Sequence, residues 1–192
     1  MYDVKRLVKD SIVVALMSLY LIIINFTGII YNTVSVFIVT VSIGLYYKDK
    51  KITRGLLGSF AVTIISFIYC GLMTVITFVF PSVLLGFLSI IMLRMNNKYI
   101  KYSSLFVVYY VIEVIIELLY AKLIVNLNVV DYILAGGGFE EVSSIINNSV
   151  TVFVIIYFIV LFIISFMKVI ILINCSKIYE NRLKKFIDGK ID

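Results

Sequence analysis

The stretch GLLGSFAVTIISFIYCGLMTVITFVFPSVLLGFLSIIML, residues 55–93, contains 39 residues without one charged side chain. At about 1.5 Å per residue a single helix of this length would extend about 58 Å, roughly twice the 30 Å hydrocarbon thickness of a bilayer. The stretch therefore predicts two membrane-spanning helices that fold back on each other. A turn at residues 70–72 gives both helices a workable length, 53–70 and 72–93, and places Pro81 as a kink inside the second.

The rest of the chain shares this apolar character. The whole chain is 62% hydrophobic with a mean hydropathy of +1.13, whereas soluble domains are about half apolar. A soluble core of 192 residues cannot bury so much apolar surface, so we expect one all-α integral membrane domain of six transmembrane helices. The other four crossings are predicted at 11–30, 31–47, 105–127 and 150–173, with a short amphipathic cytoplasmic tail at 174–192. The crossing at 31–47 has the weakest signal.

The basic residues indicate the orientation of this bundle. Fifteen of the 17 Lys and Arg side chains fall on one side of the six-helix arrangement, and short basic loops stay on the cytoplasmic side of a membrane. The connection at 128–149 has three acidic residues and no basic one, as expected of an outer loop. We therefore expect a multi-pass protein of the cell membrane with both termini in the cytoplasm. The net charge of +6 is explained by this topology, with no need for a nucleic-acid partner.

Several kinds of catalytic and metal site are missing from the sequence. The chain has no histidine, the commonest metal ligand and the usual general base near neutral pH. Its two cysteines, Cys70 and Cys175, are far apart in separate apolar runs. No phosphate-binding glycine loop, HExxH or CxxC motif or nucleophile elbow is present. We therefore expect no enzyme activity, no metal and no cofactor.

The predicted fifth helix carries two glutamates one turn apart. A charged side chain at mid-bilayer costs about 2.5–3.5 kcal/mol on insertion scales, and such residues usually mark a binding site or a pathway. Two ionised carboxylates at this spacing repel each other, so we expect at least one of them to have a raised pKa or a cationic partner. An ammonium group of a ligand would fit, with tyrosine rings adding cation–π attraction. The candidate substrate-binding face consists of Tyr109, Tyr110, Glu113, Glu117 and Tyr120.

A packing role for these glutamates is the alternative. They could instead bond to Ser, Thr or Asn side chains on neighbouring helices and only fix how the helices pack. Periodicity places Glu113 and Glu117 on one face but does not say what that face meets. Two further charges, Lys122 and Lys168, lie nearer the ends of apolar runs, and we expect both to extend to the lipid headgroups.

Pairs of small residues four positions apart occur on three predicted helices. This spacing lets helix backbones approach closely, either inside one bundle or against a partner subunit. The pairs are Ser11 with Ala15, Gly55 with Ser59, and Ser82 with Gly86.

Several of these segments carry a resemblance to a known family. The basic start before Ser11-Ile-Val-Val-Ala15, the short second helix ending in Gly44-Leu-Tyr-Tyr, the basic residues 48–54 and Gly55-Leu-Leu-Gly58 resemble the substrate-binding S components of energy-coupling factor (ECF) transporters. The segment Phe80-Pro81-Ser-Val-Leu-Leu-Gly86 resembles in particular the YybS-like (DUF2232) membrane proteins grouped with them. The likeness covers residues 9–94, about half of the chain.

The resemblance implies capture of a vitamin or a similar small cationic or zwitterionic micronutrient. It also implies partners, a transmembrane T subunit driven by two ATPase subunits. By position, Ser11 and Ala15 would match the family's Ala-xxx-Ala docking motif, with serine replacing the first alanine. Stacking of a vitamin on tryptophan, found in some members, has no counterpart because the chain has no tryptophan. The alternative function is a noncatalytic membrane scaffold, assembly or immunity protein.

Overall fold

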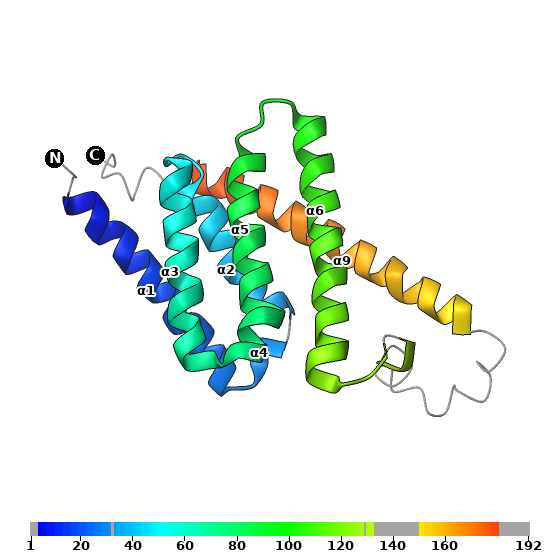
Figure 1. Ribbon diagram of the computed structural model, residues 1–192. Coiled ribbons are helices and arrows are strands. Elements are labelled where there is room, and N and C mark those ends of the chain that lie inside the picture. Colours follow the sequence, from blue (N-terminus) through cyan, green and yellow to red (C-terminus); the bar gives the residue numbers. More distant parts are fainter. Residues whose placement is uncertain (1–3, 32, 129, 133–149, 181–192) are drawn as a thin grey trace.

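The computed structural model describes residues 4–31, 33–128, 130–132 and 150–180, and every regular element within these ranges is helical. Figure 1 shows the main helices running back and forth, with the start of α1 and the end of α9 at the same end of the bundle. The elements are α1 (Val4–Phe26), η1 (Ile29–Tyr31), α2 (Thr33–Tyr47), α3 (Ile52–Cys70), α4 (Leu72–Thr74), η2 (Val75–Val79), α5 (Phe80–Leu93), α6 (Lys98–Leu119), η3 (Tyr120–Val125) and α9 (Val150–Ile178).

Five helical segments are long and apolar enough to cross a membrane, as expected of a multi-pass membrane protein. The hairpin predicted from the charge-free stretch is confirmed, because α3 ends at Cys70 and the next helical segment begins at Leu72. Gly71 between them has φ +80°, a conformation that glycine adopts without steric cost. Helix α2 has only 15 residues, in agreement with its weak signal in the sequence.

Pro81 lies inside the helical segment 72–93, as predicted, but the backbone before it differs from a simple α-helix. Residues Val75–Val79 form a π-helix, and Pro81 occupies the first turn of α5. Proline has no N–H to donate, and its ring crowds the carbonyl four residues earlier. A wider helical turn directly before it is one way to accommodate that loss, and such turns recur at functional sites.

Helices α2 and α5 pack through small residues. A Cβ atom added at Gly86 would lie 2.9 Å from the Cβ of Ile43 and 3.1 Å from the carbonyl oxygen of Thr40. The Thr40 hydroxyl donates to the carbonyl of Ser82 at 2.8 Å. The predicted close-packing role of Ser82 and Gly86 is therefore confirmed within this bundle.

Replacing Gly86 by alanine is expected to lower the free energy of unfolding by about 1–3 kcal/mol, the usual range for overpacking a tight contact. The carbonyl of Thr40 is main chain, so the helices themselves must separate to admit the methyl group. Thermal unfolding in detergent measures the effect. Leu84→Ala, at a partly exposed position on the same helix, is the matched control and should change stability less. An unchanged melting temperature for Gly86→Ala would contradict the close contact.

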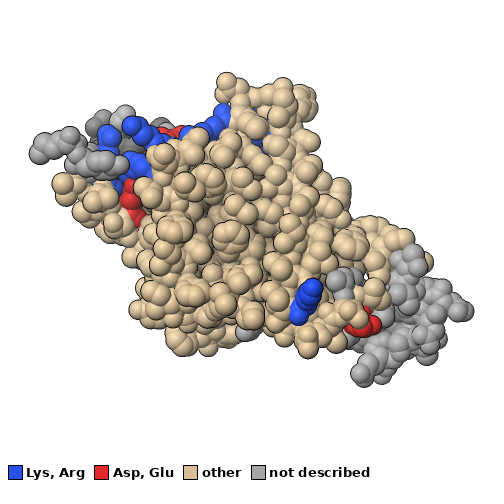
Figure 2. Space-filling view, in the orientation of Figure 1, with Lys and Arg blue, Asp and Glu red and all other residues tan. Residues whose placement is uncertain are grey.

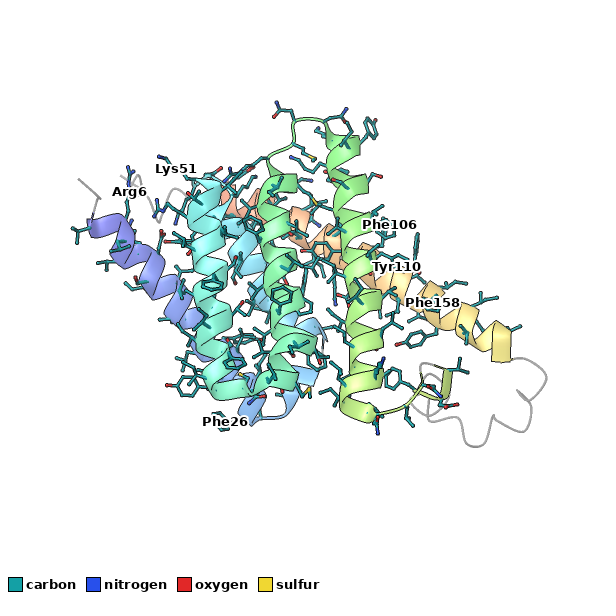
Figure 3. All side chains as sticks on the ribbon, in the orientation of Figure 1. Arg6, Phe26, Lys51, Phe106, Tyr110 and Phe158 are labelled. Atoms are coloured by element: carbon teal, nitrogen blue, oxygen red, sulfur yellow. The ribbon has the colours of Figure 1, made fainter. Side chains whose placement is uncertain are left out.

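One end of the bundle is joined by polar contacts around Asp10. Its carboxylate accepts hydrogen bonds from Tyr46 Oη at 2.9 Å, Lys50 Nζ at 3.1 Å and Arg54 Nε at 2.8 Å. These four residues come from α1, α2, the following loop and α3. Figure 2 shows Lys and Arg side chains gathered at this end, and in Figure 3 the labels Arg6 and Lys51 lie at this end.

Arg94 and Lys48 extend these contacts to α5 and α9. Arg94 donates to the carbonyls of Lys48 at 2.6 Å and Tyr47 at 3.1 Å. These carbonyls at the end of α2 have no partner within the helix, so Arg94 supplies their hydrogen bonds. Lys48 donates to Ser176 Oγ at 3.1 Å and pairs with Glu180. Five helices are thus linked at the basic end.

Candidate functional site

Glu113 lies in a buried ion pair with Lys168. The Nζ of Lys168, on α9, is 2.5 Å from Oε1 of Glu113, on α6, and the two side chains are 5% and 4% exposed. The Phe37 ring lies 5.8 Å from the same ammonium. The expectation that Lys168 extends to the headgroups is therefore wrong. Its helix face also carries the buried Leu172, so the side chain points into the bundle, where a carboxylate replaces the headgroups as its partner.

Glu117, one turn along α6, has different partners. Its Oε2 accepts hydrogen bonds from Tyr157 Oη at 2.8 Å and Tyr132 Oη at 3.2 Å. Burial, together with the neighbouring carboxylate, raises the pKa of Tyr132, so this hydroxyl acts as a donor. Among the described residues, Glu117 has these hydroxyl partners but no ion pair.

A small cavity opens beside Glu117 between α6 and α9. Its volume is about 10 Å³, room for roughly one water molecule. A vitamin-sized ligand, which needs a pocket of about 300 Å³ or more, would have to displace side chains here. The lining residues are Val114, Glu117, Leu118, Tyr132, Tyr157, Phe158 and Leu161.

Aromatic rings pack against one another where the two π-helical segments meet. Tyr120 begins η3 and lies edge-on against Phe78 of η2, with ring centroids 5.5 Å apart. The Tyr120 ring also lies 5.6 Å from that of Tyr132. The Tyr120 ring is thus connected through Tyr132 to the Glu117 carboxylate, and tyrosine rings of this kind can attract an organic cation.

The structure divides the predicted aromatic and acidic face into separate groups. Tyr109 is fully buried; its hydroxyl lies 3.1 Å from Ser89 Oγ and its ring packs edge-on against Phe37. Tyr109 is therefore a core residue. Tyr110 packs against Phe162 of α9, at 5.8 Å, and lies where α6 crosses α9 in Figure 3.

Of the five predicted residues, only Glu117 lines the small cavity. The Tyr120 ring packs against that of Tyr132, which also lines it. The sequence reasoning missed Tyr132 and Tyr157, whose hydroxyls donate to this carboxylate, and Phe78, whose ring packs against that of Tyr120. These three tyrosine and phenylalanine side chains come from three different segments of the chain, and none of those segments has a periodic polar pattern. Helix packing brings them together.

The charge balance around Glu113 therefore differs from that around Glu117. Lys168 cancels the charge of Glu113, whereas Glu117 is held by neutral hydroxyls. A single cation beside Glu117 would balance the site. Within the described ranges, no group of three Cys, Asp or Glu side chains could hold a metal ion.

The predicted docking residues Ser11 and Ala15 both lie on the exposed side of α1. Ile12 and Leu16 beside them are 53% and 61% exposed, while Met17 on the opposite side is buried. Gly55 behaves differently, because a Cβ there would lie 2.6 Å from Ile90. The small residues of α3 thus serve packing within the bundle, and those of α1 face outward.

Comparison with protein-family models, with curated proteins and with solved structures found no match. The resemblance to S components therefore stays a prediction. The contacts of Glu117 and Glu113, together with the exposed face of α1, provide the basis for proposing a function.

Proposed function

We propose that this protein is the membrane-embedded substrate-binding subunit of an ECF-type importer, similar to an S component, for a vitamin or another small cationic or zwitterionic micronutrient. The observation that carries the proposal is the Glu117 carboxylate, which is held by two tyrosine hydroxyls and has no ion pair among the described residues. A cationic group of the solute would bind there, and Tyr120, whose ring lies 5.6 Å from that of Tyr132, would supply a ring face.

The bound state requires the site to open. Tyr132 now occupies one of the positions around Glu117 that a ligand would use, and the free volume is about 10 Å³. Tyr132 belongs to the short described segment 130–132, which follows the end of η3. Its hydroxyl makes a 3.2 Å hydrogen bond, the longer of the two to Glu117. Tyr132 is therefore the side chain that the solute displaces.

The membrane topology in this proposal has six crossings and both termini in the cytoplasm of a cell. The back-and-forth course of the helices and the basic residues at one end support it (Figures 1 and 2). Helix α2 would be the sixth crossing; its 15 residues are about 22 Å long, shorter than the hydrocarbon layer. Glu117 then lies in the outer half of the membrane, accessible to a solute from outside.

The outward face of α1 would contact the T subunit. Ser11 and Ala15 are exposed there, and small exposed residues at this spacing allow close approach of a second helix. Native mass spectrometry of protein purified from its own membrane tests both parts of the proposal. We expect a bound small molecule together with copurified T and ATPase subunits.

Variants separate the two parts. Ala15→Leu should lose the copurified subunits and keep the solute, since the added side chain blocks close helix approach. Leu16→Ala, a neighbouring exposed position, is the control and should keep both. Wild-type protein with no subunits, no solute and no change in melting temperature with a panel of vitamins and amines would contradict the proposal.

A noncatalytic scaffold is the second candidate, and the buried Glu113–Lys168 ion pair favours it. In that function the glutamates only hold α6 and α9 together. Combining Glu113→Gln with Glu117→Gln would then lower thermal stability, while the folded fraction of the protein would keep its cellular function. An importer subunit would lose that function.

A further inference from the structure

We propose that the site beside Glu117 takes a solute with one positive charge and no carboxylate, and that the buried Glu113–Lys168 pair sets this preference. The inference rests on the binding function proposed above and narrows its solute from cationic or zwitterionic to cationic. Two carboxylates, Glu113 and Glu117, lie one turn apart on α6, and one ammonium, that of Lys168, pairs with the first. The three groups together therefore carry one net negative charge, which a single positive charge balances.

Lys168 is not available to a second anion. Its Nζ lies 2.5 Å from Oε1 of Glu113, and the side chain is 5% exposed. The Phe37 ring lies 5.8 Å from the same ammonium, so its neighbours are a carboxylate and an aromatic ring in place of water. An incoming carboxylate would have to take Lys168 from Glu113 and leave that buried carboxylate without its cation, which is unfavourable.

None of the described residues that line the cavity is positively charged. Its two tyrosines, Tyr132 and Tyr157, already donate their hydroxyl protons to Glu117. The connection at 128–149, which includes Tyr132, has three acidic residues and no basic one. A buried carboxylate without a cation or a donor is costly. A zwitterion should therefore bind here more weakly than an amine of the same skeleton.

Glu113 is a positioning residue in this arrangement, because it does not line the cavity and acts through Lys168. Without Glu113, Lys168 would compensate the charge of Glu117 and disfavour a bound cation. Glu113 and Glu117 are about 6 Å apart along α6. A unit charge at such a distance changes binding about 100-fold at an effective dielectric constant of about 20. The pair thus preserves the negative charge that Glu117 offers to the solute.

Three molecules with the same phenylethyl skeleton test the preference: phenethylamine has one positive charge, phenylalanine is a zwitterion and 2-phenylethanol is uncharged. Their ring suits the aromatic side chains of the lining. Calorimetric titration of the full-length protein in detergent should show that phenethylamine binds at least about 10-fold more tightly than either of the other two. Equal or tighter binding of phenylalanine or 2-phenylethanol, or no binding of phenethylamine, would overturn the inference.

Charge variants test the role of the pair. Glu113→Gln should weaken phenethylamine binding at least about 10-fold although Glu117 is unchanged, and adding Lys168→Met to it should restore wild-type affinity. Lys168→Met alone increases the net negative charge and should bind phenethylamine more tightly than the double variant. Lys122→Met, which removes an exposed lysine, is the control and should keep wild-type affinity. The melting temperature of each variant shows whether it is folded.

A pair that only packs α6 against α9 predicts equal affinity in every folded variant, and that result would refute the role of Glu113. If Glu113→Gln does not fold, the comparison of Lys168→Met with the double variant still decides, and the three ligands are compared on the wild type. The importer function fails separately, when phenethylamine follows the expected pattern but no T or ATPase subunit copurifies. Conversely, T and ATPase subunits that copurify with a zwitterionic or anionic solute would support the importer and contradict the preference for a cation.

Discussion

Lys168→Met should lower the free energy of unfolding by about 3–5 kcal/mol, the usual cost of removing one partner from a buried ion pair. The substitution leaves the Glu113 carboxylate, 3% exposed, without its cation. Methionine is close to lysine in length and shape, so the effect reports the charge more than the packing. Unfolding in mixed detergent, followed by circular dichroism, measures it.

The double variant Glu113→Gln with Lys168→Met gives the sharper result. Replacing a buried ion pair by uncharged groups of similar volume is often neutral or stabilising, so the double variant should recover most of the stability lost by Lys168→Met. The coupling between the two sites then follows from the double-mutant cycle. Lys122→Met is the control and should change stability by less than about 0.5 kcal/mol. Lys122 is an exposed lysine in the helical segment Lys98–Val125, which also contains Glu113. Additive losses at Glu113 and Lys168 would show that the two charges do not interact.

The course of the helices could be predicted where charge and length leave one solution. The charge-free stretch gave spans 53–70 and 72–93, and the structure has Ile52–Cys70 and Leu72–Leu93. Helix α6 begins at Lys98, earlier than the predicted span at 105, because Asn97 caps it and accepts a hydrogen bond from the Tyr99 N–H at 3.0 Å. Hydropathy defines where a helix meets hydrocarbon, whereas the cap defines where the helix starts.

The partner of Glu113 could not be predicted from the sequence. Its helical spacing showed that it shares a side of α6 with Glu117, but Lys168 lies 55 positions away on α9. Which helix packs against that side depends on tertiary packing, and two helices that cross obliquely bring only short segments together (Figure 1). The sequence therefore indicated that at least one of these glutamates has a raised pKa or a cationic partner, but it could not identify Lys168 as that partner.

Glu117→Gln is expected to weaken binding of the proposed solute by at least about 30-fold, because removing one charge of a buried hydrogen-bonded charge pair costs about 2–5 kcal/mol. Stability should change much less than in Lys168→Met, since the amide oxygen of glutamine can still accept a hydrogen bond from Tyr157 or Tyr132. Retention of the solute in native mass spectrometry measures binding, and the melting temperature measures stability.

Tyr110→Phe is the matched control, because Tyr110 belongs to the predicted face but packs against Phe162 and does not line the cavity beside Glu117. It should keep the solute. If Glu113 serves packing and Glu117 serves binding, substitutions at the two sites should have opposite effects on stability and on solute retention. Lys168→Met disturbs the pair that holds α6 to α9, so it should reduce stability most, whereas Glu117→Gln should reduce solute retention most. If Glu117→Gln reduces only stability, Glu117 is a second packing contact and the importer function loses its main support.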